Sequence, residues 1–275
     1  MNLAVIEELE VVGVEGSADA RFAAGSISKP VAALTALRLG LDLDQEVNER
    51  LLSWQLPDGE GVTLRRLLGH TAGLGMPFCP GSAAGEELPT LVEILAEVRS
   101  EAAPGGFRYS GGGYVVVQLL VEDVTGRAFG DVAEELVLGP LGMADSTFAP
   151  GEGHRYAERA AAGLTTTVGD LARFLIALQQ GAEGAAAMLA THVELPAEGE
   201  WTVLRDLGVE PPTRAGLGLL LSDGWFSHLG GAHDSFSALW GSLDGRRGVV
   251  AQQAGGATPE LFQRIAGAVE GVAVR

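Results

Sequence analysis

The chain has 275 residues, of which 47% are hydrophobic, and it carries 36 acidic against 18 basic side chains. The formal charge of −18, without any Lys/Arg-rich run, excludes nucleic acid as an expected partner, because phosphate backbones would be repelled. A single cysteine, Cys79, excludes an internal disulfide framework and a metal site built from cysteines.

The N-terminal segment is predicted to form one or two short strands over residues 3–14, which are rich in Val and Ile. The first cation of the segment is Arg21, and no apolar run in the chain approaches the roughly 18 residues that span a bilayer. We therefore expect no signal peptide, no membrane span and a cytoplasmic location.

The middle of the chain is predicted to be mainly helical, because apolar residues recur at helical spacing from Ser28 onward. Thr90 and Glu93 have the spacing of a capping box, which indicates the start of a helix. Helical patterns cover residues 63–69, 90–99, 113–124, 129–137 and 168–179.

The C-terminal part returns to strand patterns after about residue 214. Asp244-Gly245 indicates a turn between the last two of these strands. Thr258 and Pro259 then predict the N-cap and the first residue of a final helix. The segments predicted as strands are residues 215–223, 224–231, 235–243 and 248–256.

Strands at both ends of the chain and helices between them predict an α+β fold arranged like a sandwich. Residues 1–22 and 214–275 would form an antiparallel sheet covered by the last helix. A mainly helical part, residues 23–213, would be inserted between the second and third strands. The two parts would form one unit with the functional site in a cleft between them, while the oligomeric state stays open.

Lys29 is the only lysine in the chain and lies three positions after Ser26. Positions i and i+3 of a helix share a face, so the Ser26 hydroxyl can approach the Lys29 amine. A partly buried neutral lysine can take the proton of a serine and activate it as a nucleophile, whereas arginine does not release its own proton. A serine also stands three residues before a lysine by chance, so this pair alone is a weak signal.

Further segments follow Ser26-Ile27-Ser28-Lys29 in a fixed order. They read VTLRRLLGHTAGL, PGGFRYSGGGYVVVQLLVEDVTG, LGPLGMADSTF and AGLTTTVGDLARFL. Together they cover residues 20–180, with a weaker stretch at 215–254, and they resemble the serine β-lactamase-like, penicillin-binding-protein-like superfamily. The resemblance is to its branch of class C β-lactamases, D-aminopeptidases and esterases. It implies a β-lactamase/transpeptidase-like fold and a serine hydrolase that needs no metal or cofactor.

The resemblance also implies roles for individual residues. Ser26 matches the acylated serine of the family and Lys29 its base partner. Tyr109 matches the tyrosine of the Y-x-N element, which moves protons and activates the deacylating water. His228-Leu229-Gly230 stands where the family has K-T-G or H-x-G, on the substrate side. The N–H groups of Gly231 and Ser26 would form the oxyanion hole.

Two departures from the family pattern concern substrate recognition. Gly111 replaces the asparagine of Y-x-N, which contacts the lysine and the acylamino chain of a substrate. His228 replaces a permanently charged lysine that attracts substrate carboxylates. A histidine with an ordinary pKa would be mostly neutral near pH 7 and would gain charge as the pH falls. These departures favour small esters or amides over β-lactams.

Two classes of function follow. The first is a serine hydrolase, carboxylesterase-like or β-lactamase-related, that acts on a small ester, amide or β-lactam through an acyl-enzyme. The alternative is a penicillin-binding or pseudo-enzyme module that acylates with little turnover, or a true β-lactamase or D-Ala peptidase. We expect no catalytic role for the remaining histidines or for the cysteine. His70 is expected in a turn, His154 and His192 on the surface, His233 and Asp234 in a polar loop, and Cys79 as an incidental thiol.

Overall fold

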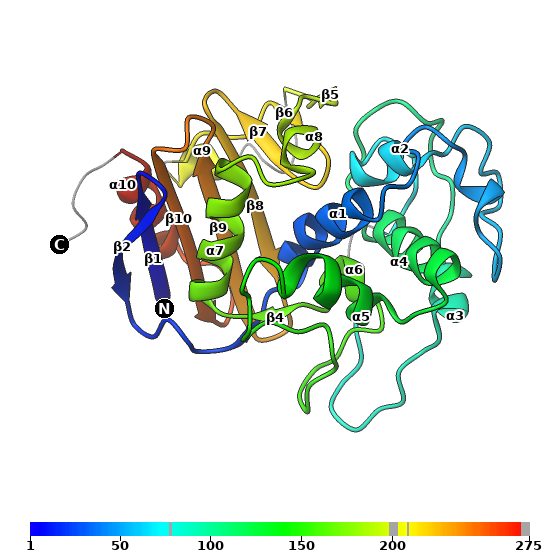
Figure 1. Cartoon of the computed structure of the whole chain (residues 1–275), viewed down its shortest axis with the longest axis horizontal. Helices are drawn as coiled ribbons and strands as arrows, with labels where there is room; N and C mark the ends of the chain where they lie inside the picture. The colour runs from blue at the N-terminus through cyan, green and yellow to red at the C-terminus, as the bar shows by residue number, and fades with distance from the viewer. Residues whose placement is uncertain (77–78, 198–202, 208, 271–275) are drawn as a thin grey trace.

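The structure, a computed structural model, describes residues 1–76, 79–197, 203–207 and 209–270. Its largest feature is an antiparallel sheet, on the left in Figure 1, in which the N-terminal hairpin lies beside the C-terminal strand. From one edge to the other its strands are β2 (Glu10–Glu15), β1 (Asn2–Glu7), β10 (Arg247–Ala254), β9 (Ser235–Ser242), β8 (Trp225–Gly231), β7 (Leu220–Ser222), β6 (Arg214–Ala215) and β5 (Val193–Glu194).

The sheet is covered on both faces by helices, because successive residues of a strand point to opposite sides. On one face Phe226 and Leu239 are fully buried in the core that includes α7 (Val168–Gln179). On the other face Trp240 and neighbouring apolar residues pack against α10 (Pro259–Glu270). Figure 1 shows α7 in front of the sheet and α10 behind it. A short helix, α9 (Val203–Asp206), also lies at the sheet.

The remaining helices form the part on the right of Figure 1, with α1 and α4 at its centre. Both are apolar around most of their circumference and buried along most of their length, as expected of helices inside a core. Its elements are β3 (Phe22–Ala23), η1 (Gly25–Ile27), α1 (Ser28–Arg38), η2 (Val47–Glu49), α2 (Leu64–Leu68), α3 (Leu91–Leu95), α4 (Gly111–Thr125), α5 (Phe129–Ala133), the π-helix η3 (Glu134–Leu138), α6 (Arg159–Ala162), β4 (Thr165–Thr166) and α8 (Ala185–Leu189).

The predicted α+β fold is confirmed, and several element boundaries agree closely with the sequence patterns. The helix predicted from Ser28 begins there, the capping box of Thr90 and Glu93 is present, and the Thr258 hydroxyl accepts from the Leu261 N–H. The helix predicted over residues 90–99 is shorter and ends at Leu95. Two elements from the middle of the chain, α7 and β5, lie with the sheet, because an apolar stripe does not specify which surface will cover it.

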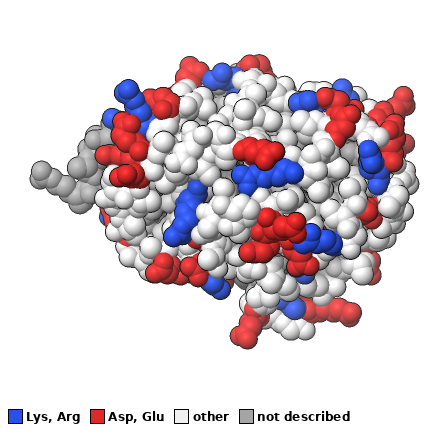
Figure 2. All heavy atoms as spheres, in the orientation of Figure 1, with Lys and Arg blue, Asp and Glu red and all other residues white. Residues whose placement is uncertain are grey.

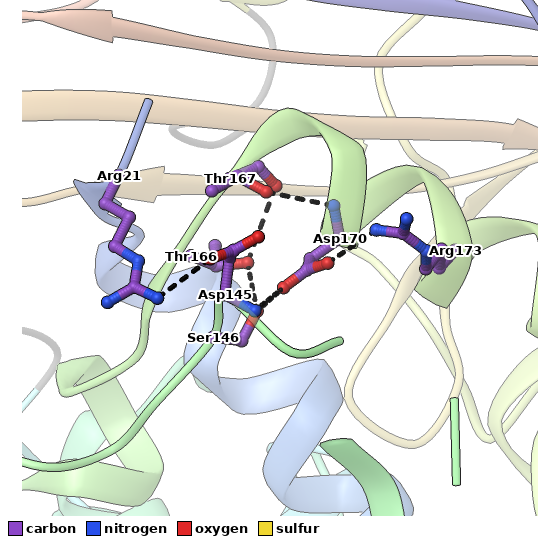
Figure 3. A network of polar contacts seen from close by, with 7 residues as sticks. All are labelled: Arg21, Asp145, Ser146, Thr166, Thr167, Asp170 and Arg173. Atoms are coloured by element: carbon purple, nitrogen blue, oxygen red, sulfur yellow. Dashed lines mark hydrogen bonds and ion pairs between the residues drawn. The ribbon is translucent and has the colours of Figure 1, made fainter. Parts of the chain in front are cut away.

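A buried carboxylate fixes the short β3–β4 sheet that leads into η1 (Figure 3). Asp170, in the first turn of α7, accepts from the Asp145 N–H at 2.9 Å and from the Ser146 hydroxyl at 2.8 Å. The Ser146 hydroxyl also lies 2.7 Å from the hydroxyl of Thr166 in β4. Arg173 pairs with the same carboxylate at 2.7 Å. These contacts join α7 to residues 145–146 and to β4. Because β4 pairs with β3, they also hold β3, the strand that precedes η1.

On the face of the molecule shown in Figure 2, the negative charge is dispersed. On the face shown in Figure 2, acidic side chains lie in several separate places with arginines among them. Exposed ion pairs such as Arg65–Asp44, at 2.7 Å, join opposite charges and contribute little to stability. Within the described ranges, no helix has the length and apolar character needed to cross a membrane.

Candidate active site

Ser26 and Lys29 lie where η1 runs into α1. Lys29 Nζ lies 2.9 Å from Ser26 Oγ and donates to the carbonyl oxygen of Ala161 in α6 at 2.9 Å. Lys29 is only 1% exposed, whereas Ser26 is half-buried. The turn is held by the Ser28 hydroxyl, which donates to the Gly25 carbonyl and accepts from the Leu164 N–H. The hydroxyl of Ser26 is therefore accessible while the amine beside it is sequestered.

The end of β8 lies against η1, and two glycines allow this close approach. A Cβ on Gly230 would collide with the carbonyl oxygen of Ala24. Gly25 has a φ of 52°, which favours glycine, and a Cβ there would collide with the carbonyl oxygen of Gly231. The backbone at Gly230 and Gly231 therefore runs beside the segment that carries Ser26, so the fold brings the predicted oxyanion residues together.

His228, in β8, is buried and neutral. Its Nδ1–H donates to the Leu229 carbonyl at 2.8 Å, which leaves a lone pair on Nε2. Nε2 is buried without a hydrogen-bond partner among the described residues. Burial, and next to it the positive charge of Lys29, lowers the pKa of His228 to about 3. The expectation that His228 becomes charged as the pH falls is therefore wrong for the working range of an enzyme.

This buried histidine should make folding stability fall in acid. Unfolded, its pKa is about 6.5, so between pH 6.5 and 3 the unfolded chain binds more protons than the native one. The stabilisation that comes from keeping His228 neutral is fully present above pH 6.5 and is lost as the pH falls. The loss reaches about 2 kcal/mol at pH 5. Urea unfolding at pH 7.5 and pH 5.0 should show a smaller acid loss for His228→Gln than for the wild type. Exposed His233→Gln is the control, and equal losses in His228→Gln and the wild type would contradict the account.

Tyr109 is carried by the loop directly before α4. Its ring centroid lies 5.1 Å from Lys29 Nζ and 6.1 Å from the ring of His228. Ser110 caps α4 by accepting from the Gly113 N–H at 2.9 Å, which fixes where the loop ends. The structure therefore brings together Ser26, Lys29, Tyr109 and His228 from three separate places in the chain.

Gly111 is the first residue of α4 and is buried. Its N–H donates to the Met76 carbonyl at 2.7 Å. Lacking a side chain, it offers no amide to Lys29 or to a substrate. Gly111 therefore cannot supply the amide that the family pattern noted in the sequence has at this position.

Two aromatic neighbours of Lys29 were given no catalytic role from the sequence. The ring of Tyr114 lies 5.9 Å from Lys29 Nζ, and its hydroxyl donates to the Leu68 carbonyl at 2.9 Å. His70 stacks on Tyr109 with ring centroids 4.4 Å apart. The proximity of Tyr114 to Tyr109 in sequence was a usable signal, because a helix beginning between them returns the later side chain to the same region.

The other polar residues lie at the edge of this arrangement. The N–H of His233 donates to the Tyr156 hydroxyl at 3.1 Å, and its ring stacks on His154 at 4.5 Å, so the loop after β8 is tied to residues 154–156. His192, expected on the surface, is half-buried with Nε2 2.9 Å from the Thr71 hydroxyl. Burial raises the pKa of Cys79 to about 12, which keeps this thiol protonated and unreactive.

Comparisons with known proteins concern the family and the fold of this chain. A family model described as Beta-lactamase matches residues 1–266. Penicillin-binding protein 4 of Amycolatopsis lactamdurans is 30% identical over 153 residues, which are 52% of this chain and 40% of that protein. Esterase EstB of Burkholderia gladioli is 33% identical over 162 residues, or 50% of this chain and 41% of that one. The match thus spans about two fifths of the length of each of these two relatives.

A solved structure shows the same fold. The D-amino acid amidase of Ochrobactrum anthropi SV3 superimposes with a TM-score of 0.79 and 19% identity. The superposition covers 100% of this chain and 94% of the amidase. At this identity the likeness establishes the architecture, and the chemistry has to be argued from the residues themselves.

Proposed function

This chain belongs to the Beta-lactamase family, and from that we propose that it is a serine hydrolase working through an acyl-enzyme. The observation that carries the proposal is the 2.9 Å approach of Lys29 Nζ to Ser26 Oγ. A nucleophile and its base must lie within hydrogen-bonding reach for proton transfer, and these two atoms do. The Tyr109 ring, 5.1 Å from the same amine, supplies a second group able to move protons.

Acylation requires Lys29 in its deprotonated form: Ser26 Oγ attacks the carbonyl carbon of the substrate, and its proton passes to the Lys29 amine. A neutral amine has one lone pair, and donation of one N–H to the Ala161 carbonyl leaves that lone pair available for Ser26. The tetrahedral oxyanion is held by the N–H groups of Ser26 and Gly231. Collapse breaks the bond to the leaving alcohol or amine. This group receives the proton of Ser26 by way of Lys29 and Tyr109.

Deacylation reverses the proton path. Tyr109, close to Lys29, passes its phenolic proton to Lys29 as it takes one from the water that attacks the acyl carbon, and Lys29 gives a proton to Ser26 Oγ as the ester bond breaks. Lys29 relays the proton between Tyr109 and Ser26. Each step conserves its protons without a cofactor, so the residues described above suffice for turnover.

The substrate side of the site favours neutral esters and amides. His228 is buried and neutral, so it offers a carboxylate no positive charge. Gly111 offers no amide to an acylamino chain. A missing charge-assisted contact costs about 1.5–3 kcal/mol, or one to two powers of ten in kcat/KM.

We expect kcat/KM for p-nitrophenyl butyrate to exceed that for a chromogenic cephalosporin by at least about 100-fold, because both recognition groups for the β-lactam are absent. Steady-state assays of the two substrates at pH 7.5 measure the ratio. The double variant Gly111→Asn, His228→Lys should move preference toward the cephalosporin, with thermal unfolding recorded to show that it is folded. Equal turnover of the two substrates by the wild type would contradict this account of recognition.

A second candidate is a module that acylates with little turnover. The similarity to a penicillin-binding protein over 153 residues favours it, and Gly111 removes a group that family members place near the catalytic lysine. Rapid mixing with the p-nitrophenyl ester separates the two functions. A hydrolase continues after the first equivalent of p-nitrophenol, whereas such a module stops at one equivalent per Ser26.

A further inference from the structure

His70 is tied to the chain on both sides of Tyr109. Its carbonyl accepts from the Arg108 N–H at 2.7 Å, and its Nδ1 accepts from the Ser110 N–H at 3.1 Å. Between these bonds its ring stacks on that of Tyr109, with centroids 4.4 Å apart and 29° between the planes. One residue thus fixes the backbone before and after Tyr109 and the face of its phenol.

His70 is itself held rigidly. It is 4% exposed, and its φ of 56° lies in the left-handed region, which is uncommon for a residue with a side chain. Its ring also meets the ring of Tyr114 at 5.3 Å and that of Phe107 at 5.9 Å. A backbone conformation of this kind persists only where its surroundings enforce it, and such residues gather at functional sites.

The imidazole of His70 is neutral and unsuited to acid–base work. Because Nδ1 accepts a hydrogen bond, the ring proton is on Nε2, which is buried without a hydrogen-bond partner among the described residues. Burial, and next to it the positive charge of Lys29, lowers the pKa of His70 well below its usual range. A ring that does not titrate beside Lys29 is a stable support for the neighbouring phenol.

We infer that His70 is a positioning residue that fixes the phenol of Tyr109 beside Lys29, rather than the turn element expected from the sequence. This inference rests on the proposed function, in which Tyr109 moves protons. Loss of the stack and of the Ser110 bond would let the phenol shift, and a misplacement of about 1 Å can cost about 100-fold in rate. His70 is 4% exposed and offers a substrate almost no surface, so we expect KM to change little.

Two variants separate the contribution of the stacked ring of His70 from that of its Nδ1 acceptor. His70→Asn keeps an acceptor near Nδ1 and tolerates a left-handed backbone, but it removes the stacked ring. His70→Phe keeps a ring and removes the acceptor, and it serves if the first variant does not fold. We expect each to lower kcat for p-nitrophenyl butyrate about 10- to 100-fold with KM within about twofold. His192→Asn replaces a half-buried histidine whose Nε2 lies 2.9 Å from the Thr71 hydroxyl; it is the matched control and should keep its kcat.

A double-mutant cycle with Tyr109→Phe is the decisive test, because a merely structural role would lower kcat independently of Tyr109. We expect His70→Asn to lower kcat no more than about twofold further in the Tyr109→Phe enzyme. Losses that multiply, or a His70→Asn enzyme with full kcat, would overturn the positioning role alone. A Tyr109→Phe enzyme with full kcat would overturn this inference and the role of Tyr109. Loss of activity in Ser26→Ala would still support the proposed hydrolase.

Discussion

Replacing Ser26 with alanine is expected to reduce turnover of p-nitrophenyl butyrate by a factor on the order of 10⁴ or more. The reason is that Ser26 Oγ is the hydroxyl that lies 2.9 Å from the amine of Lys29, the only lysine in the chain. The variant keeps the backbone N–H groups, so weak catalysis from oxyanion binding would remain. A loss of this size corresponds to about 5 kcal/mol of transition-state stabilisation.

The comparison requires that the variant be folded and that the change be specific. Ser26 is half-buried in η1, directly before α1, so its replacement by alanine should shift the thermal midpoint only slightly. Ser53→Ala, an exposed serine bonded to Asp123, is the control and should retain full turnover. A Ser26→Ala enzyme with more than about 1% of wild-type kcat would contradict the assignment of the nucleophile.

Lys29→Arg is expected to be nearly as inactive as Lys29→Ala, although it conserves the charge. A guanidinium does not release its proton and so cannot accept one from Ser26. The site is also filled, because Lys29 is 1% exposed and its amine lies near the rings of both Tyr109 and Tyr114. A larger planar group would displace one of these rings, as overpacked cores commonly show.

The measurement is kcat for the ester in Lys29→Arg and Lys29→Ala, with urea unfolding to correct for any loss of folded protein. We expect both to lie at least about 1000-fold below the wild type, which is about 4 kcal/mol. If Lys29→Arg retains more than a tenth of wild-type kcat, a loss under about 1.4 kcal/mol, the lysine acts by its charge and not as a base.

Much of the fold follows from local patterns in the sequence. Apolar residues at helical spacing predict α1 and α7 closely, and alternating segments predict β8, β9 and β10. The sequence could not predict that α7 covers the face of the sheet opposite to α10. Its partners lie in strands at both ends of the chain, and the pattern of one helix does not identify them.

The candidate site likewise has features that the sequence predicts and features that it does not. The approach of Ser26 to Lys29 is predictable because it depends on residues three apart. The bond between Ser110 and His70 joins residues 40 apart and needs a left-handed backbone at His70, which only tertiary contacts can impose. The neutrality of His228 likewise depends on its burial in the sheet, whereas an exposed histidine would titrate near pH 6.5.

Covalent labelling of Ser26 is the most direct test of the central claim that this residue forms an acyl-enzyme. The wild type and Ser26→Ala would be treated with a fluorophosphonate, and the intact mass and the tryptic peptides would be recorded. The account predicts one adduct per wild-type chain, on the peptide containing Ser26, and no adduct on Ser26→Ala. An adduct that survives the Ser26→Ala change, or that maps to another serine, would contradict it.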